Sequence, residues 1–287
     1  MKRLVGGWLI VLFFVRPPFA QEQKPEGFGL QRDRILAAAG DYCETLKNMA
    51  LNFVCREKIE EKTYEFSRGL IFRPSKERRR GLSPLPDLRR TRTVKASFVY
   101  DYQLIKKGGV LRERRDLLEE NGKKKNLQDV DLRSGRMSGT YIVFGPVGFL
   151  SRSWQPRFEY EILGTETLGP TKAVVLRARP REFTAENYCF GRIWLDAAGA
   201  DILQIEWEPE SILNFQETVD SPIGELKRKI TWTVRYDVVK SGLRFPSLQT
   251  VKEYLATPAG KDHLKYEATY VYDRYRFFTV ETEVVVK

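Results

Sequence analysis

The apolar residues of this chain follow two different periods, and the change between them marks the end of its best helix. Between residues 35 and 53 they recur every three or four positions, which places them on one face of an α-helix. The set is Ile35, Ala39, Tyr42, Leu46, Met49 and Phe53. After about Asn52 the period becomes two, as in a strand with one solvated face. The pattern predicts an amphipathic helix that leads into a β-strand.

Strand patterns separated by short turns fill the rest of the chain. The clearest alternation places Ile230, Trp232, Val234, Tyr236 and Val238 on one face. Turns are predicted at Gly108-Gly109, Asn121-Gly122, Gly169-Pro170, Ala197–Ala200, Ser241-Gly242 and residues 257–262, and a loop over residues 75–92. Short turns join antiparallel neighbours, whereas parallel strands need long crossovers. We therefore expect a mostly β protein, an antiparallel meander with one N-terminal amphipathic helix.

The first twenty residues have the pattern of a secretory signal peptide. Lys2 and Arg3 precede an uncharged, mostly apolar run from Leu4 to Val15, and Arg16-Pro17-Pro18 ends it before Ala20. The run is too short for a transmembrane helix. We expect cleavage after Ala20, a flexible leader over residues 21–30 and a single β-rich domain over residues 31–287. The protein is then exported, to the periplasm or out of the cell.

Composition indicates a globular domain with a basic surface. Hydrophobic residues make up 42% of the chain and aromatic residues 12%, an enrichment that suits strands. The formal charge is +11, and +8 remains without the three cations of the first twenty residues. Such a surface attracts anionic envelope components, although a merely solvated basic surface explains it as well. No aromatic residues interleave the basic runs 76–80, 89–92 and 123–125, so nucleic acid is not an expected partner.

The chain has three cysteines, Cys43, Cys55 and Cys189. In an oxidising compartment an odd number suggests one disulfide and one free thiol. We expect a Cys43–Cys55 disulfide, because Cys43 lies on the flank of the helix and Cys55 begins the next strand. Pairing of Cys189 with either is the alternative. With one histidine and no CxxC motif, a metal site is not expected.

No residue cluster indicates a catalytic centre. His263 is the only histidine, it lies in a predicted loop, and the chain has no GxSxG motif, so we expect an exposed histidine with no role as a base. Glu119 and Glu120 point to opposite faces of a strand, and Glu206 and Glu208 suit a solvated face, so neither pair fits a glycosidase. We expect neither enzymatic activity nor a cofactor.

Three stretches carry a resemblance to a known family. They are VYDYQLIKKGG (residues 99–109), RERRDLLEENGKK (112–124) and the hairpin formed by residues 191–196 and 202–207. With the helix, they resemble the periplasmic lipoprotein-carrier fold, which outer-membrane lipoprotein-sorting proteins share with a sigma-E regulatory sensor. The resemblance implies a curved, unclosed β-barrel around helices that holds an apolar cavity. The chain also resembles exported bacterial proteins with a C…FxC opening and an FGPxGxLS segment, a likeness that implies no activity.

The leading hypothesis is a non-catalytic envelope protein that binds or carries an apolar or lipidated ligand in the concave face of the sheet. Candidate cavity residues are Leu46, Met49 and Phe53 of the helix side and Tyr100, Tyr102, Trp232 and Tyr236 of the strands. A gap between these walls would be dry and apolar with a few hydroxyls, which suits an acyl chain; a filled core is the alternative. An envelope sensor or scaffold that docks another protein through the sheet is the second hypothesis, and an envelope hydrolase the third.

Overall fold

The computed structural model describes residues 27–49, 52–71, 85–107, 110–133, 145–183, 190–211 and 217–278. Its helical elements are α1 (Gly27–Met49), α2 (Gly145–Leu150) and the single turns η1 (Gln155–Arg157) and η2 (Pro209–Ser211). The strands are β1 (Asn52–Ile71), β2 (Leu85–Lys107), β3 (Val110–Glu120), β4 (Lys123–Leu127), β5 (Phe158–Leu168), β6 (Thr171–Pro180), β7 (Gly191–Asp196), β8 (Ile202–Trp207), β9 (Thr218–Ser221), β10 (Gly224–Arg235), β11 (Val238–Lys240), β12 (Leu243–Phe245), β13 (Leu248–Ala256) and β14 (Asp262–Phe277).

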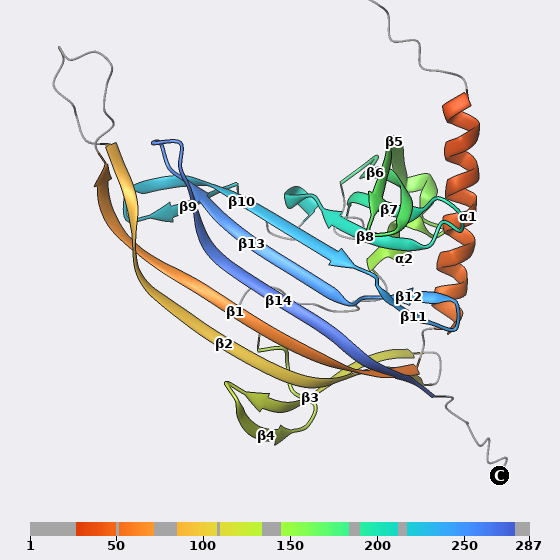
Figure 1. The fold of residues 1–287 in the computed structure, drawn as a ribbon, viewed down its shortest axis with the longest axis horizontal. Helices are drawn as coiled ribbons and strands as arrows, with labels where there is room; N and C mark the ends of the chain where they lie inside the picture. The colour runs from red at the N-terminus through yellow and green to blue at the C-terminus, as the bar shows by residue number, and fades with distance from the viewer. Residues whose placement is uncertain are drawn as a thin grey trace, which may run out of the picture.

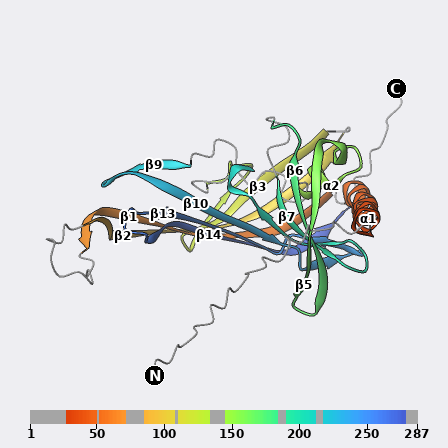
Figure 2. The ribbon, with the colours of Figure 1, turned by 90° about the horizontal axis from the view of Figure 1, so that it is seen from above.

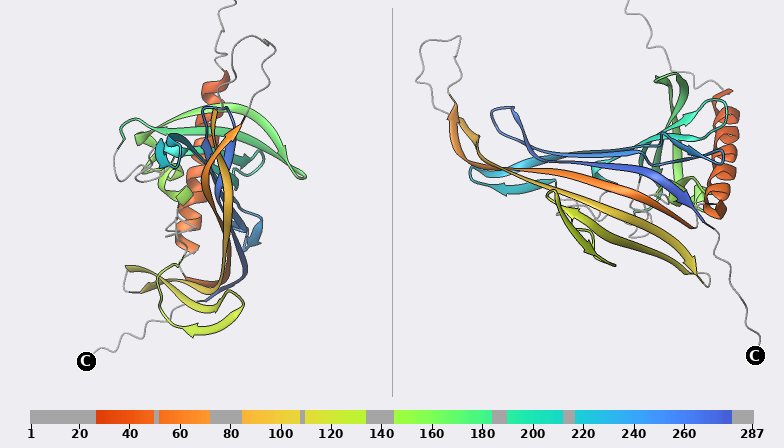
Figure 3. Two further views of the ribbon diagram at one scale, coloured as in Figure 1. Left: turned by 90° about the vertical axis from the view of Figure 1, so that its left-hand side faces the viewer. Right: turned by 60° about the horizontal axis from the view of Figure 1, so that its bottom comes forward.

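One large antiparallel sheet dominates the molecule (Figure 1). Within the described residues twelve strands form it, in the order β4-β3-β2-β1-β14-β13-β10-β8-β7-β6-β5 with β9 beside β10, and β11 and β12 form a separate hairpin. The sheet is curved and does not close into a barrel (Figures 1 and 3). The predicted fold class is therefore confirmed, including the open barrel that the resemblance implies.

The first strand of the sheet and the last are neighbours. β14 lies between β1 and β13, and Ile59 pairs with Tyr270. Arg56 reinforces the pair, since its Nε and Nη2 donate to the carboxylate of Asp273 at 2.9 and 2.6 Å. These two residues are 217 positions apart in the sequence. The first and the last strand of the described chain are therefore paired near the middle of the sheet.

Helix α1 covers one end of the sheet (Figure 1). It begins at Gly27, inside the range expected to be a leader, and ends at Met49, so Phe53 belongs to β1. As the spacing predicts, its buried face carries Ala39, Tyr42, Cys43 and Leu46. The Tyr42 hydroxyl donates to the backbone oxygen of Arg244 at 3.2 Å and accepts from the amide of Arg244 at 3.0 Å. These bonds attach the helix to the β11–β12 hairpin.

Five of the six predicted turns lie where the sequence places them, and Gly108-Gly109 lies outside the described residues. Asn121 and Gly122, between β3 and β4, have φ angles of 51° and 75°, and Ser241 and Gly242, between β11 and β12, have the same values. This left-handed backbone fits the twist of a two-residue hairpin, and glycine adopts it without steric cost. Short turns of this kind keep consecutive strands adjacent, which confirms the antiparallel meander.

The sequence predicts a loop over residues 75–92, but β2 already begins at Leu85. Pairing between β1 and β14 stops at Thr63, and beyond it β1 and β2 pair with each other as far as Ile71 and Leu85. We call residues 64–71 and 85–93 the distal arm; it projects from the end of the sheet opposite α1 (Figures 1 and 3). In residues 86–93 of β2 the buried positions are the adjacent Asp87 and Leu88, so this part lacks the alternation of a strand with one buried face. The basic run 76–80 lies outside the described residues.

His263 is buried, which corrects the expectation of an exposed loop histidine. β14 begins at Asp262, so His263 is a strand residue opposite Leu255. Its Nε2 lies 2.6 Å from Oδ1 of Asp87 in the distal arm. The ring of Phe66 packs edge-on against the imidazole, with 5.5 Å between ring centroids. The histidine therefore ties the arm to the sheet.

The main hydrophobic core lies on one side of the sheet, which we call the inner face. A small cluster of Ala173, Val175, Trp194 and Leu203 covers the other side of β6, β7 and β8, the outer face. A third, of Leu88, Leu226 and Leu255, lies at the base of the distal arm. In the described part of the chain, no helix has both the length and the apolar run needed to cross a membrane.

Candidate functional site

The strand register aligns side chains from six strands across the middle of the inner face. Residues two apart on a strand point to the same side, so opposite residues share a face. Tyr100 of β2 and Tyr272 of β14 flank Glu57 of β1. Toward the other edge, Trp232 of β10 lies between Val251 of β13 and Trp207 of β8. The alternation in the sequence thus becomes one continuous surface of aromatic, aliphatic and a few polar groups.

The structure brings six of the seven predicted cavity residues to this face. Leu46, Phe53, Tyr100, Tyr102 and Tyr236 are at most 2% exposed and belong to the main core, and Trp232 packs against it partly buried. The ring centroid of Phe53 lies 5.8 Å from that of Tyr102. The side chain of Met49 lies outside the described residues. Because Phe53 belongs to β1, this contact joins neighbouring strands of the sheet, and Leu46 is the predicted residue that the helix brings to the same core.

A buried ion pair lies among these aromatic side chains. Arg115 of β3 donates from Nε to Oε2 of Glu57 at 2.7 Å, and the two side chains are 6% and 0% exposed. Glu113 approaches the same guanidinium at 3.5 Å, and the ring of Tyr102 lies 4.7 Å from the Arg115 Cζ. Burial raises the pKa of Glu57, against the opposing effect of Arg115.

The pair shows one signal in the sequence. Glu57 stands between Cys55 and Ile59 on the buried side of β1, where a strand with one solvated face would have another apolar residue. A charged residue at such a position needs a buried partner. The partner is 58 positions away, so the strand pattern alone does not identify it.

Three side-chain N–H donors on the inner face have no acceptor among the described residues. They are Nε1 of Trp207, Nε1 of Trp232 and Nε2 of Gln249. Trp207 and Gln249 are 5% and 4% exposed, and the two indole rings lie 5.5 Å apart. Trp194 on the outer face contrasts with them, because its Nε1 donates to Glu166 at 2.8 Å. Buried donors are rarely left without an acceptor, so this group is unusual.

Elements outside the sheet cover the inner face. Phe149 of α2 packs edge-on against Trp207, with 5.6 Å between ring centroids. Residues 128–133, which we call the crossing segment, place Val130 and Leu132 against the core. The segment is held where the amide of Arg133 donates to the Tyr100 hydroxyl at 3.2 Å. Helices α1 and α2 lie together at the end of the sheet where β5–β8 lie (Figures 1 and 2).

The expected Cys43–Cys55 disulfide is absent from the structure, in which both cysteines are free and buried. The expectation requires β1 to return alongside α1, but β1 runs away from the helix (Figure 1). Burial raises the pKa of the Cys43 thiol to about 12 and raises that of Cys55 as well. Cys189 lies outside the described residues, so its pairing with either of them, the alternative considered from the sequence, stays untested.

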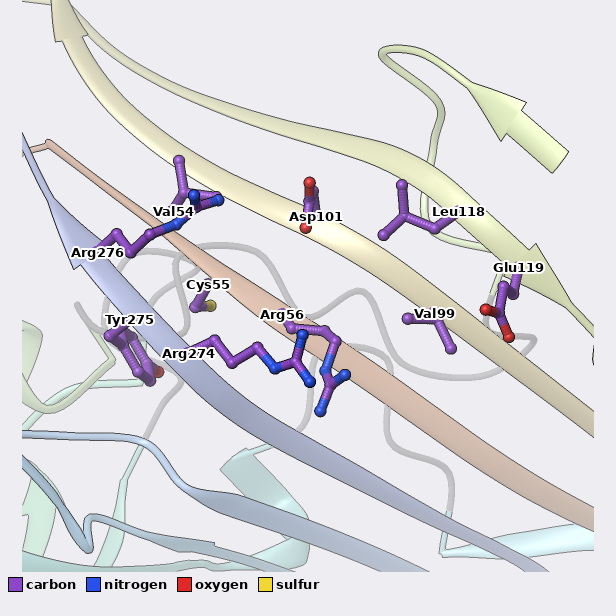
Figure 4. A pocket seen from close by; sticks show the side chains of 10 residues that line it. All are labelled: Val54, Cys55, Arg56, Val99, Asp101, Leu118, Glu119, Arg274, Tyr275 and Arg276. Atoms are coloured by element: carbon purple, nitrogen blue, oxygen red, sulfur yellow. The ribbon is translucent and has the colours of Figure 1, made fainter. Parts of the chain in front are cut away.

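A groove of about 540 Å³ crosses the outer face over β14, β1, β2 and β3 (Figure 4). Strand pairing is irregular here, at Val54–Arg56 and at Val99–Tyr100. Arg274 extends toward Arg56, while Asp101 and Glu119 line the other side (Figure 4). The groove therefore carries charges of both signs among apolar side chains such as Val54, Val99 and Leu118.

Three of the four carboxylates considered from the sequence, Glu120, Glu206 and Glu208, are engaged in ion pairs. Glu206 lies 2.7 Å from Arg192, and Glu120 lies 3.0 Å from Arg133. Among the described residues, no group of three or more histidine, cysteine or acidic side chains is placed to hold a metal ion.

Comparison with solved structures finds distant likenesses. A structure described as an outer-membrane lipoprotein-sorting protein domain, from Vibrio parahaemolyticus, matches at 13% identity with a TM-score of 0.37 and covers 88% of this chain and 95% of its own. A LolA superfamily protein from Nitrosomonas europaea matches at 12% identity with a TM-score of 0.32 and covers 89% and 97%. No protein-family model and no curated protein matches the sequence.

A chain of the MucA/MucB complex from Pseudomonas aeruginosa matches more weakly. The identity is 10% and the TM-score 0.20, over 87% of this chain and 98% of that one. The first two of these structures are described by the lipoprotein-sorting name of the group that the sequence resembles. At such identities and TM-scores, they assign no residue and no activity to this chain.

Proposed function

We propose that the protein is a non-catalytic envelope protein that binds an apolar or lipidated ligand against the inner face of its sheet. The three donors of Trp207, Trp232 and Gln249 carry the proposal. A buried donor without an acceptor costs about 1–3 kcal/mol. A ligand with a long apolar body and a few acceptor oxygens, such as the ester carbonyls of an acylated molecule, satisfies the donors and matches the apolar side chains around them.

The ligand reaches the inner face at the end of the sheet that helices α1 and α2 cover. Helix α1 is attached through Tyr42 to the backbone of Arg244, and its exposed Asp41 accepts from Arg152 at 2.6 Å. Neither contact is part of the backbone ladder of the large sheet. Helix α1 can therefore move without breaking the strand pairing. The apolar part of the ligand then replaces the contacts that the helix made with the inner face.

The place of action follows from residues 1–20, which lie outside the described residues. We propose export to the periplasm, or secretion, because this segment has the pattern of a signal peptide. Acylated molecules are abundant in the envelope, so a ligand of this class is available there.

The test compares ester lipids with ether lipids that lack the carbonyl acceptors. Wild-type protein is expected to retain acylated molecules on extraction and mass spectrometry, and to prefer ester-linked over ether-linked phosphatidylglycerol. Trp232→Phe keeps a ring but removes the N–H, so the ester preference falls about tenfold, the value of one hydrogen bond. Trp194→Phe is the matched control: its donor is already bonded to Glu166 on the outer face, so ligand preference stays unchanged.

Two outcomes contradict the proposal. One is folded wild-type protein that retains no acylated molecule and binds neither lipid. The other is an ester preference that Trp232→Phe and Trp194→Phe lower equally.

The groove on the outer face favours a second function, the docking of another envelope protein. Its exposed Arg274 and Arg276 and its part-buried Asp101 and Glu119 offer charges of both signs to a partner. A stoichiometric protein crosslinked at this groove, from a preparation with no bound lipid, would support a scaffold instead of a carrier.

A further inference from the structure

The exposed side chains of the distal arm are mostly cationic. Arg68, Arg89, Arg90 and Arg92 are exposed, and Glu65 is the exposed carboxylate among them. Asp87, the other acid of the arm, is buried against His263 and also faces Lys261. Arg92 Nη1 lies 3.9 Å from Glu65 Oε1 in a pair open to solvent, which screens it. The arm therefore presents a net positive charge.

Apolar side chains are exposed beside these cations. Leu70, near the end of the arm, is 54% exposed, and Val94, at its base, is 39% exposed. The guanidinium of Arg90 lies 3.9 Å from the ring centroid of Tyr64, which holds that cation on the surface. Exposed cations next to exposed apolar groups suit the headgroup region of a bilayer, where phosphates and the upper acyl chains lie together.

The position of the arm allows it to reach a flat surface. Beyond Thr63 it is no longer paired with β14 as a strand, although Asp87 and Phe66 contact His263 at its base, and it lies at the end of the sheet opposite α1 (Figures 1 and 3). The covering helices therefore stay away from whatever the arm contacts.

We propose that the distal arm docks on a bilayer that contains anionic phospholipid, with its arginines at the phosphates and Leu70 among the headgroups. The complementary charge favours a phospholipid surface, and the exposed leucine distinguishes it from a free phosphate ion. The docking needs no ligand on the inner face, so it holds or fails independently of the proposed function.

The experiment is co-sedimentation of the protein with vesicles of phosphatidylcholine alone or mixed with phosphatidylglycerol. Binding is expected to the mixed vesicles, to weaken with added salt, and to be absent with phosphatidylcholine alone. Arg68→Gln/Arg89→Gln/Arg92→Gln weakens binding about a hundredfold, since each surface cation contributes about fivefold. Should the triple variant not fold, Arg89→Gln/Arg92→Gln is expected to lose about 25-fold.

The matched control removes three cations from another strand. Lys123→Gln/Lys124→Gln/Lys125→Gln changes the net charge equally, and all three positions are exposed on the edge strand β4. Binding by this variant is expected to stay within a few-fold of wild type. An equal loss in both triple variants would mean that net charge alone attracts the protein, and undiminished binding by the arm variant would place the contact elsewhere; either result overturns the proposal.

Discussion

At the scale of single residues, Glu57 and Arg115 form a buried ion pair on the inner face. The carboxylate is fully buried, and the guanidinium is 6% exposed beneath the Tyr102 ring. A buried pair adds little net stability, but a buried charge without its partner is costly. Loss of Arg115 alone is therefore expected to destabilise the fold more than loss of both charges together.

Arg115→Met is expected to lower the free energy of unfolding by about 3–5 kcal/mol at pH 8, as measured by urea denaturation. Burial already raises the pKa of Glu57 in the folded protein above its unfolded value of about 4.3, and loss of the guanidinium raises it further. A raised folded pKa means that protonation favours the folded state. The deficit is therefore expected to shrink as the pH falls from 8 toward 5.

A double variant serves as the control for this prediction. Glu57→Gln/Arg115→Met removes both charges, so it should be more stable than Arg115→Met at pH 8 and lack the pH-dependent deficit. Equal stability of wild type and Arg115→Met at pH 8 would show that Glu57 has no need of this partner.

Cys43 and Cys55 are expected to resist thiol reagents in the folded protein. Their raised pKa values leave almost no thiolate, the reactive form, at pH 8, and both side chains are buried. Ellman's reagent should label neither in native protein and both in denaturant. Peptide mapping without a reductant assigns the labels, and a denatured chain that stays unlabelled at both positions would contain the Cys43–Cys55 disulfide.

At the scale of elements, Gly191 sets how closely β7 and β8 approach. A Cβ atom at this position would collide with the backbone oxygen of Glu206 and lie 2.9 Å from the Cα of Trp207. Backbone atoms cannot rotate away as a side chain does. Glycine is therefore required here by the space between two strands and not by a turn.

Gly191→Ala is expected to destabilise the fold by about 1–3 kcal/mol, the usual cost of an overpacked site, in thermal or urea denaturation. Gly148→Ala is the matched control, because nothing lies within 4 Å of its added methyl group in α2. There alanine should be neutral or slightly stabilising, since it favours a helix. Wild-type stability of Gly191→Ala would mean that the two strands lie farther apart.

The elements also show how far local patterns predict structure. Turns such as Asn121-Gly122 were predictable because few residues adopt their backbone angles. The start of β2 at Leu85 was not, because Asp87 and Leu88 are the two buried residues of the range 86–93, and two adjacent residues give no alternation. Helix α1 begins before its apolar stripe, so its first turn at Gly27 carries no periodic signal.

At the scale of the whole molecule, the sequence predicts the fold class and most of the inner face. Alternation assigns Tyr100, Tyr102, Trp232 and Tyr236 to buried sides of strands, and the meander brings these sides together. Alternation does not say which residues lie opposite one another on strands far apart in sequence. The Glu57–Arg115 pair and the meeting of Trp207 with Trp232 depend on that register, so they appear only in the structure.

The place of β14 between β1 and β13 determines when the molecule can be completed. Synthesis starts at the N-terminus, so β1 emerges about 200 residues before the strand that must lie beside it. Until then the sheet can form only as two separate pieces, β1 to β4 and β5 to β13, each with an open edge. Such distant pairing slows folding, and open edges invite pairing with other chains. A nascent chain of this design therefore needs protection until its last strand arrives.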